Sequence, residues 1–145
     1  MKKEIKTEIM INASREKIWE ILTDFKSYPE WNPFIQSIAG ELKLDGKLKA
    51  KIVPPGSKGM MFKPTIIALE KPSKFIWLGH FLFKGLFDGQ HQFELFENED
   101  GNTIFIQKEI FKGVLVPFLG KKLELNTKNG FNQMNQNLKK IAENG

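Results

Sequence analysis

A chain of 145 residues with 41% hydrophobic and 27% charged side chains is long enough to bury the core of one domain, so we expect a single domain over 1–145. The chain contains no cysteine, which excludes a disulfide framework, a thiolate nucleophile and a cysteine-ligated metal site. Its net charge of +5 is carried by dispersed lysines and a single arginine, Arg15, a pattern that argues against nucleic acid as a partner.

No apolar run approaches the roughly 20 residues that a membrane-spanning helix needs. The first residues, Met-Lys-Lys-Glu-Ile-Lys, also lack the apolar core of a signal peptide. We therefore expect a cytoplasmic protein without stable membrane insertion.

The N-terminal part of the chain predicts one strand and one or two short helices. Residues 4–11 alternate apolar and polar side chains, which is typical of a half-buried strand. Ser14 is a suitable N-cap for a helix over 15–25, whose apolar side chains recur every three or four residues. Segment 24–34 contains Pro29, Pro33 and several aromatic residues, among them Trp31 and Phe34. It predicts a short helical turn and a bend that folds back onto the core or closes one end of a pocket.

From residue 35 onward, short strands alternate with turns, as in an antiparallel meander. The expected strands cover 35–44, 47–53, 62–70, 75–83, 87–97 and 103–112. Asp45-Gly46 is a strong hairpin signal between the first two of them.

The last segment, 121–143, has a clean helical period. Apolar side chains and one threonine recur every 3.6 residues at Leu123, Thr127, Phe131, Met134, Leu138 and Ile141. Gly130 inside this helix costs about 1 kcal/mol relative to alanine, and Met134 has a flexible side chain. A gap between the helix and a sheet would explain both residues, and so would close local packing.

This order of elements predicts an α+β helix-grip fold. A curved seven-stranded antiparallel sheet would wrap around the long C-terminal helix, and the short N-terminal helices would close one end. Such a sheet curls too strongly to pack flush against the helix everywhere, so a cavity between them is expected.

Three motifs carry a family resemblance. They are Ile-Asn-Ala-Ser-Arg-Glu-Lys-Ile-Trp-Glu-Ile-Leu-Thr-Asp-Phe at 11–25, Tyr-Pro-Glu-Trp-Asn-Pro-Phe at 28–34 and Gly-Leu-Phe-Asp-Gly-Gln-His-Gln-Phe at 85–93. They resemble the polyketide-cyclase-like branch of the START-related (SRPBCC) superfamily, and the third resembles a small bacterial branch within it. The resemblance implies a helix-grip domain that encloses a hydrophobic or amphipathic molecule, which could be lipid-like, polyketide-like or isoprenoid-like. It implies no particular reaction, because the superfamily includes lipid carriers, hormone binders, cyclases and co-chaperone domains.

The hairpin 87–112 carries the most informative chemistry. A turn centred on Asp100 pairs His91 with Glu109 and Phe93 with Gln107, and it puts these four side chains on one aromatic-rich face that we assign to the interior. Three functions are open for the polar patch of His91, Gln107 and Glu109. It could orient the polar head of a ligand, it could be a self-satisfied structural pair, or His91 and Glu109 could act as general acid and base.

The candidate pocket residues are Trp31, Phe34, Trp77, Phe81, His91, Phe93, Phe105, Gln107, Glu109, Thr127, Gly130, Phe131 and Met134. The resemblance puts Trp77 and Phe81 on the inward face of strand 75–83 and His80 on the outward face. No metal site and no cofactor is expected, because the two histidines lack a ligand spacing and no phosphate-binding motif is present.

The sequence thus predicts, first, a protein that binds or carries a small hydrophobic ligand. An enzyme of the cyclase, dehydratase or isomerase type is the alternative, and a co-chaperone-like interaction domain is the third. The sequence leaves open whether the protein is a monomer or a dimer.

Overall fold

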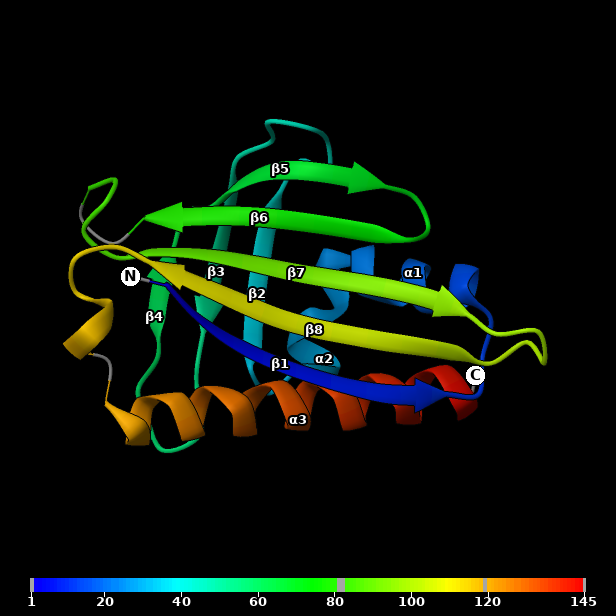
Figure 1. Ribbon diagram of the computed structural model, residues 1–145. Coiled ribbons are helices and arrows are strands. Elements are labelled where there is room, and N and C mark those ends of the chain that lie inside the picture. Colours follow the sequence, from blue (N-terminus) through cyan, green and yellow to red (C-terminus); the bar gives the residue numbers. More distant parts are fainter. Residues whose placement is uncertain (1, 81–82, 119, 145) are drawn as a thin grey trace.

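The computed structural model describes residues 2–80, 83–118 and 120–144 (Figure 1). Its strands are β1 (Lys2–Ile11), β2 (Ile35–Gly40), β3 (Leu48–Ile52), β4 (Met60–Phe62), β5 (Thr65–Glu70), β6 (Lys74–His80), β7 (Asp88–Glu97) and β8 (Thr103–Lys112). Its helices are α1 (Arg15–Thr23), α2 (Tyr28–Trp31) and α3 (Lys121–Asn144), with 3₁₀ turns η1 (Phe25–Ser27) and η2 (Val116–Phe118).

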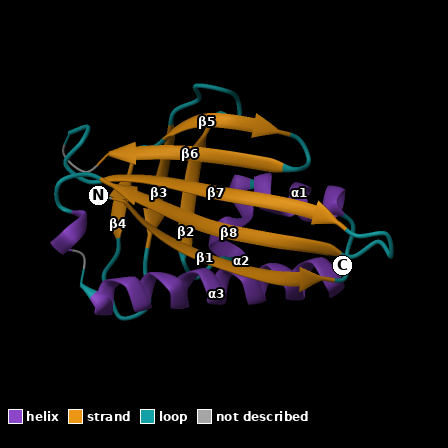
Figure 2. Ribbon diagram, viewed as in Figure 1, coloured by secondary structure: helices purple, strands orange, loops and turns teal. Residues whose placement is uncertain are grey.

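The strands form two antiparallel sheets, one in the order β1-β8-β7-β6-β5 and one in the order β2-β3-β4. A bridge between Lys47 and Thr65 connects them. The strands of the smaller sheet run across those of the larger one, and α3 lies along the open side between the two (Figure 2). This arrangement confirms the predicted α+β helix-grip fold.

The predicted number of strands was wrong, because the expected strand 62–70 is divided in two. Its first residue, Phe62, ends β4, which pairs with β3, whereas residues 65–70 form β5, which pairs with β6. Pro64 lies at the break, and it has no backbone N–H to continue a ladder. The expected strand 35–44 is also shorter and ends at Gly40, so that Asp45-Gly46 turns the chain within a longer connection.

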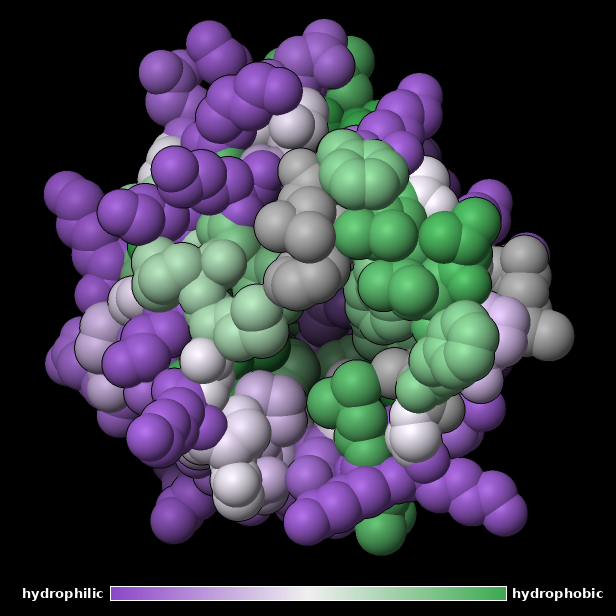
Figure 3. All heavy atoms as spheres, turned by 90° about the vertical axis from the view of Figure 1, so that its left-hand side faces the viewer, coloured by the Kyte–Doolittle hydropathy of each residue, from purple (hydrophilic) through white to green (hydrophobic). Residues whose placement is uncertain are grey.

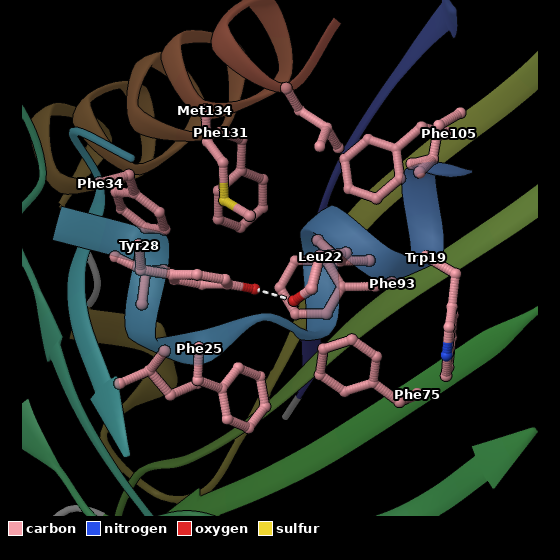
Figure 4. Packing of buried hydrophobic residues seen from close by; sticks show 14 of the residues in the cluster. Trp19, Leu22, Phe25, Tyr28, Phe34, Phe75, Phe93, Phe105, Phe131 and Met134 are labelled. Carbon is pink, nitrogen blue, oxygen red and sulfur yellow. Dashed lines mark hydrogen bonds between the residues drawn. The ribbon is translucent and has the colours of Figure 1, made fainter. Parts of the chain in front are cut away.

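The N-terminal helices follow the prediction closely. The Ser14 hydroxyl accepts a hydrogen bond from the Lys17 amide at 3.2 Å, which caps α1 as expected. Pro29 lies in the first turn of α2, where its missing N–H costs nothing. The Tyr28 hydroxyl donates to the backbone oxygen of Leu22, and this bond ties α2 to α1 (Figure 4).

The hydrophobic core lies between the C-terminal two thirds of α3, the short helices and the larger sheet. Figure 4 shows Phe34 and Phe131 facing each other beneath α3, and their ring centroids are 5.4 Å apart. A β-carbon at Gly130 would lie 2.4 Å from Cδ1 of Phe34. Gly130 therefore leaves room for the ring of Phe34. Of the two explanations for Gly130 and Met134, close packing holds at this level of the helix, and there is no gap. Met134 is fully buried in the core.

Among the described residues, no helix is long and apolar enough to cross a membrane.

Candidate functional site

A cavity of about 590 Å³ lies at the N-terminal end of α3. Its floor and walls come from the first two turns of α3, from β4, and from the ends of β6, β7 and β8 that lie near them. The lining includes Phe34, Ile52, Met60, Phe62, Pro64, Trp77, Gly89, Glu109, Phe111, Leu115, Phe118, Leu123, Asn126 and Thr127. Figure 3 looks onto the face where the cavity opens, and the surface there is hollowed.

The cavity exists because the apolar stripe of α3 is longer than the part of the sheets that covers it. Thr127 and the stripe residues from Phe131 to Leu138 are buried, whereas Leu123 is 47% exposed and lies at the cavity. β1 and β8 run away from α3 toward this end of the helix (Figure 1), and the first turns of α3 face a space that the core side chains do not fill.

The walls are mainly aromatic and aliphatic, and charged groups are few. Lys58 and His80 lie at the rim, on the loop before β4 and at the end of β6. Glu109 of β8 also lines the cavity, with 13% of its side chain exposed. An acidic side chain thus lies on an apolar wall.

The predicted register of the β7–β8 hairpin is confirmed, with His91 opposite Glu109 and Phe93 opposite Gln107. Nδ1 of His91 lies 3.3 Å from Oε1 of Glu109, and Nε2 lies 2.9 Å from Oε1 of Gln107. The imidazole is 0% exposed, and the ring centroids of Trp77, Phe93 and Phe131 are all within 5.2 Å of it. His91 is therefore a core residue beneath the cavity wall.

The polar chain continues from His91 into the core. The Gln107 amide donates to Oδ1 of Asn135 at 2.8 Å, and the Asn135 amide donates to Oγ1 of Thr7 at 2.8 Å. The Thr7 hydroxyl in turn donates to the backbone oxygen of Gln107 at 3.2 Å. These bonds connect β1, β7, β8 and α3 and satisfy buried polar groups that would otherwise be costly.

The direction of this chain determines which nitrogen of His91 carries a proton. Because each amide N–H₂ is used toward the next residue, Oε1 of Gln107 is left to accept from His91, so Nε2 carries hydrogen. A hydrogen bond between Nδ1 and Oε1 of Glu109, which lie 3.3 Å apart, then requires a proton on one of these two atoms. A pair bonded in this way is either imidazolium with carboxylate or neutral imidazole with carboxylic acid.

The second carboxyl oxygen of Glu109, Oε2, is buried and has no hydrogen-bond partner among the described residues. If the shared proton is on His91, Oε2 belongs to a carboxylate. If it is on Oε1, Oε2 is the carbonyl oxygen of the acid. Oε2 is a hydrogen-bond acceptor in both states. A polar group of a bound molecule that contacts Oε2 must therefore donate a hydrogen bond to it.

The structure brings only part of the predicted pocket together. Phe34, Trp77, Glu109 and Thr127 line the cavity. His91 and Gln107 lie behind its wall, and Trp31, Phe93, Phe105, Gly130, Phe131 and Met134 belong to the core. Phe81 lies outside the described residues. The six core residues do not line this cavity, because the sheets and α3 pack closely at their level.

The two residues predicted to act as acid and base differ in their access to the cavity. A molecule in the cavity would reach Glu109, whereas His91 is fully buried and does not contribute to the lining. His91 can act only through Glu109.

Sequence reasoning missed Asn135 and Thr7, which complete the polar chain. Thr7 occupies an inward position of the alternating strand 4–11, so its hydroxyl was a detectable signal. Asn135 lies next to Met134 on α3, and only the tertiary structure shows that it faces Gln107. The lining residues from the connection between β8 and α3, such as Leu115 and Phe118, follow no periodic pattern that would have indicated them.

His80 and Asp88 close the rim between β6 and β7. Nδ1 of His80 lies 2.8 Å from Oδ1 of Asp88, and the Gly85 amide donates to both carboxyl oxygens at 3.1 Å. Burial would raise the pKa of Asp88, but hydrogen bonds from His80 and Gly85 and the charges of His80 and Lys84 outweigh it, so that this pKa is lowered. His80 was expected to be a plain surface residue, and it is exposed, but it also lies at the cavity rim.

The fold and the cavity define a START-like helix-grip protein. The chain belongs to the family described as polyketide cyclase / dehydrase and lipid transport, whose family model matches residues 2–143. A search of curated proteins found no match.

Solved structures with the same fold have diverse functions. The chain is similar to a START superfamily protein from Mycobacterium smegmatis, with a TM-score of 0.75, 17% identity and 97% of each chain covered. It is similar to norcoclaurine synthase from Thalictrum flavum, solved with dopamine and hydroxybenzaldehyde, with a TM-score of 0.72 and 14% identity over 97% of this chain and 86% of that one. It is also similar to the di-domain aromatase/cyclase StfQ from the steffimycin biosynthetic pathway, with a TM-score of 0.73 and 12% identity. This chain is covered to 99% in that comparison but spans only 51% of the di-domain protein.

Proposed function

We propose that this protein binds a small amphipathic molecule whose apolar body occupies the cavity and whose hydroxyl or N–H group donates to Oε2 of Glu109. One observation carries the proposal: Glu109 lines a largely apolar cavity, and its buried Oε2 has no hydrogen-bond partner among the described residues. An unsatisfied buried polar group costs about 1–3 kcal/mol, and a donor from the ligand would remove that cost. The family's description, which includes lipid transport, supports a ligand of this class.

The charge of the ligand's polar group follows from the His91–Glu109 pair. Because the two residues share one proton, the pair is neutral overall in both of its protonation states. A neutral donor such as an alcohol or a phenol satisfies Oε2 without adding a buried charge. A ligand carboxylate at this point would face a carboxyl oxygen with no proton between them, so we expect it to be disfavoured.

The proposal is tested with 2-naphthol and 2-methoxynaphthalene, which differ in the presence of one hydroxyl donor. The wild type should bind 2-naphthol at least about tenfold more tightly, and Glu109→Met should abolish that difference. Glu109→Gln is the informative control. Its amide N–H₂ can donate to Nδ1 of His91 while its oxygen faces the cavity, so it should keep a preference for the donor. Equal binding of both compounds by the wild type would contradict the proposal.

Acid–base catalysis is the second candidate, and the shared proton favours it. Glu109 could take a proton from a bound molecule at Oε2 while Oε1 passes its own to Nδ1 of His91. Exchange of the α-hydrogens of 2-tetralone for deuterium tests this chemistry. An enzyme should accelerate the exchange, and Glu109→Gln should abolish the acceleration although it still binds the ketone. A binding protein should give the background rate with both proteins.

A further inference from the structure

The cavity opens onto a face where exposed apolar side chains gather (Figure 3). We define the mouth rim as Met60, Leu115, Phe118 and Leu123, four residues that both line the cavity and remain solvent-exposed. Phe118 is 81% exposed and Met60 is 50% exposed. Val114 and Leu125, beside the rim in the chain, are 69% and 58% exposed. An apolar patch of this kind on a protein surface marks a site of interaction.

Lysines surround the mouth rim. The described parts of the segments 54–63, 83–88 and 112–124 build this end of the molecule. Their charged residues are six exposed lysines (Lys58, Lys63, Lys84, Lys112, Lys121 and Lys122) and two acidic residues (Asp88 and Glu124). Both acidic residues are already engaged, since Asp88 pairs with His80 and Glu124 pairs with Lys3 at 2.8 Å.

The opposite end of the β7–β8 hairpin has the reverse character. Its turn carries Glu97, Glu99 and Asp100 and no lysine. The excess of exposed lysines near the mouth is therefore absent from the turn at the other end of this hairpin.

We propose that the mouth rim docks onto the surface of a lipid bilayer that contains anionic lipids. Exposed aromatic and aliphatic side chains enter the headgroup region of a bilayer, and flanking lysines each add about 1 kcal/mol of attraction to an anionic surface. A second copy of the chain is a poor occupant, because the same positive charge would face itself. Nucleic acid is a poor one too, because the centre of the surface is apolar and the surrounding cations are lysines.

Docking in this orientation would place the cavity opening against the acyl chains. An apolar molecule could then pass between the bilayer and the cavity without crossing water. This exchange rests on the proposed function, whereas docking itself does not.

Sedimentation with vesicles tests the docking. The wild type should partition onto vesicles of 70% phosphatidylcholine and 30% phosphatidylglycerol, at least about tenfold more strongly than onto phosphatidylcholine alone. Phe118→Glu and the double variant Lys121→Glu/Lys122→Glu should each reduce this binding about tenfold or more.

Two matched controls separate docking from general charge and hydrophobicity. Phe96→Glu changes an exposed phenylalanine on β7, away from the mouth, and should bind like the wild type. Lys26→Glu/Lys140→Glu gives the same net charge as the rim double variant but alters exposed lysines elsewhere, so it should lose much less binding. In a Phe118→Trp variant, the fluorescence of the introduced tryptophan should also shift to the blue when the protein is mixed with anionic vesicles.

Equal binding to neutral and anionic vesicles, or equal losses in the rim and control variants, would overturn the proposal. Binding of the wild type to an acidic protein, together with no binding to vesicles, would also overturn the proposal. The occupant of the mouth rim would then be a protein. Uptake of 2-naphthol without vesicle binding would overturn docking and leave the proposed function intact. Vesicle binding without uptake of 2-naphthol would support docking and contradict the proposed function.

Discussion

The ring of Phe34 occupies the space that a β-carbon of residue 130 would need, 2.4 Å from the nearest ring carbon. Phe34 follows the bend after α2, and Gly130 lies in the middle of α3, so this contact holds the short helices against the long one. It also moves the cavity away from the middle of α3 to its N-terminal end.

The first prediction concerns this contact. Gly130→Ala should lower the free energy of unfolding by about 1–3 kcal/mol, because overpacking at Phe34 outweighs the gain of about 1 kcal/mol in helix propensity. Urea denaturation measures the change. Gly120→Ala is the control, since none of the described residues beyond its chain neighbours lies within 4 Å of a β-carbon there, and it should change stability by less than about 0.5 kcal/mol. A stabilised Gly130→Ala protein would show that the ring does not restrict this position.

The second prediction concerns the buried polar chain. Asn135→Leu removes the acceptor for the Gln107 amide and the donor to Thr7, so it should cost about 1–3 kcal/mol. Asn132→Leu changes an exposed asparagine on the same helix and should cost little.

The same chain predicts the protonation of His91, which ¹⁵N NMR of the imidazole can measure. At neutral pH the wild type should carry hydrogen on Nε2. In Asn135→Leu the Gln107 amide is free to turn, and this preference should weaken. A wild-type ring with hydrogen on Nδ1 alone would mean that the chain runs in the other direction.

The third prediction separates the cavity from the core. Thr127→Trp should fill the cavity and weaken uptake of the fluorescent probe N-phenyl-1-naphthylamine about tenfold or more. Leu125→Trp changes an exposed residue of the same helix outside the lining and should leave uptake unchanged. Met134→Trp should instead overpack the core and lower the free energy of unfolding by about 1–3 kcal/mol. Unchanged uptake by Thr127→Trp would place the probe elsewhere.

The fourth prediction concerns pH. The pKa of Asp88 is lowered in the folded protein, so its ionised form stabilises the fold. This contribution is fully present above the unfolded value of about 3.8 and is lost as the pH falls through the lower folded value. Thermal unfolding from pH 2 to 7 should therefore give the wild type a higher melting temperature than Asp88→Asn at pH 5 to 7. The two melting temperatures should converge as the pH falls to 2. A difference that stays constant over this range would contradict the lowered pKa.

Local patterns were sufficient to predict most of the architecture. The hydroxyl of Ser14 caps the N-terminus of α1 as predicted, and the buried side chains of α3 follow the predicted 3.6-residue period. The turn at Asp100 and the alternation on both strands were enough to pair His91 with Glu109, because a shift by one residue would have exposed an aromatic-rich face.

The location of the cavity could not be predicted in the same way. A glycine in a helix is compatible with empty space and with an approaching ring, and only the position of Phe34 decides between them. The split between β4 and β5 depended on how the backbone turns at Pro64. The mouth rim was missed because exposure of Phe118 or Leu123 depends on how far the sheets extend over α3, which no local pattern encodes.

A crystal structure of the complex with 2-naphthol would test the central claim most directly. We predict the naphthalene ring in the cavity against Trp77 and its oxygen about 3 Å from Oε2 of Glu109. A complex with the ring outside the cavity, or with its hydroxyl directed to the rim near Lys58 and away from Glu109, would contradict the account.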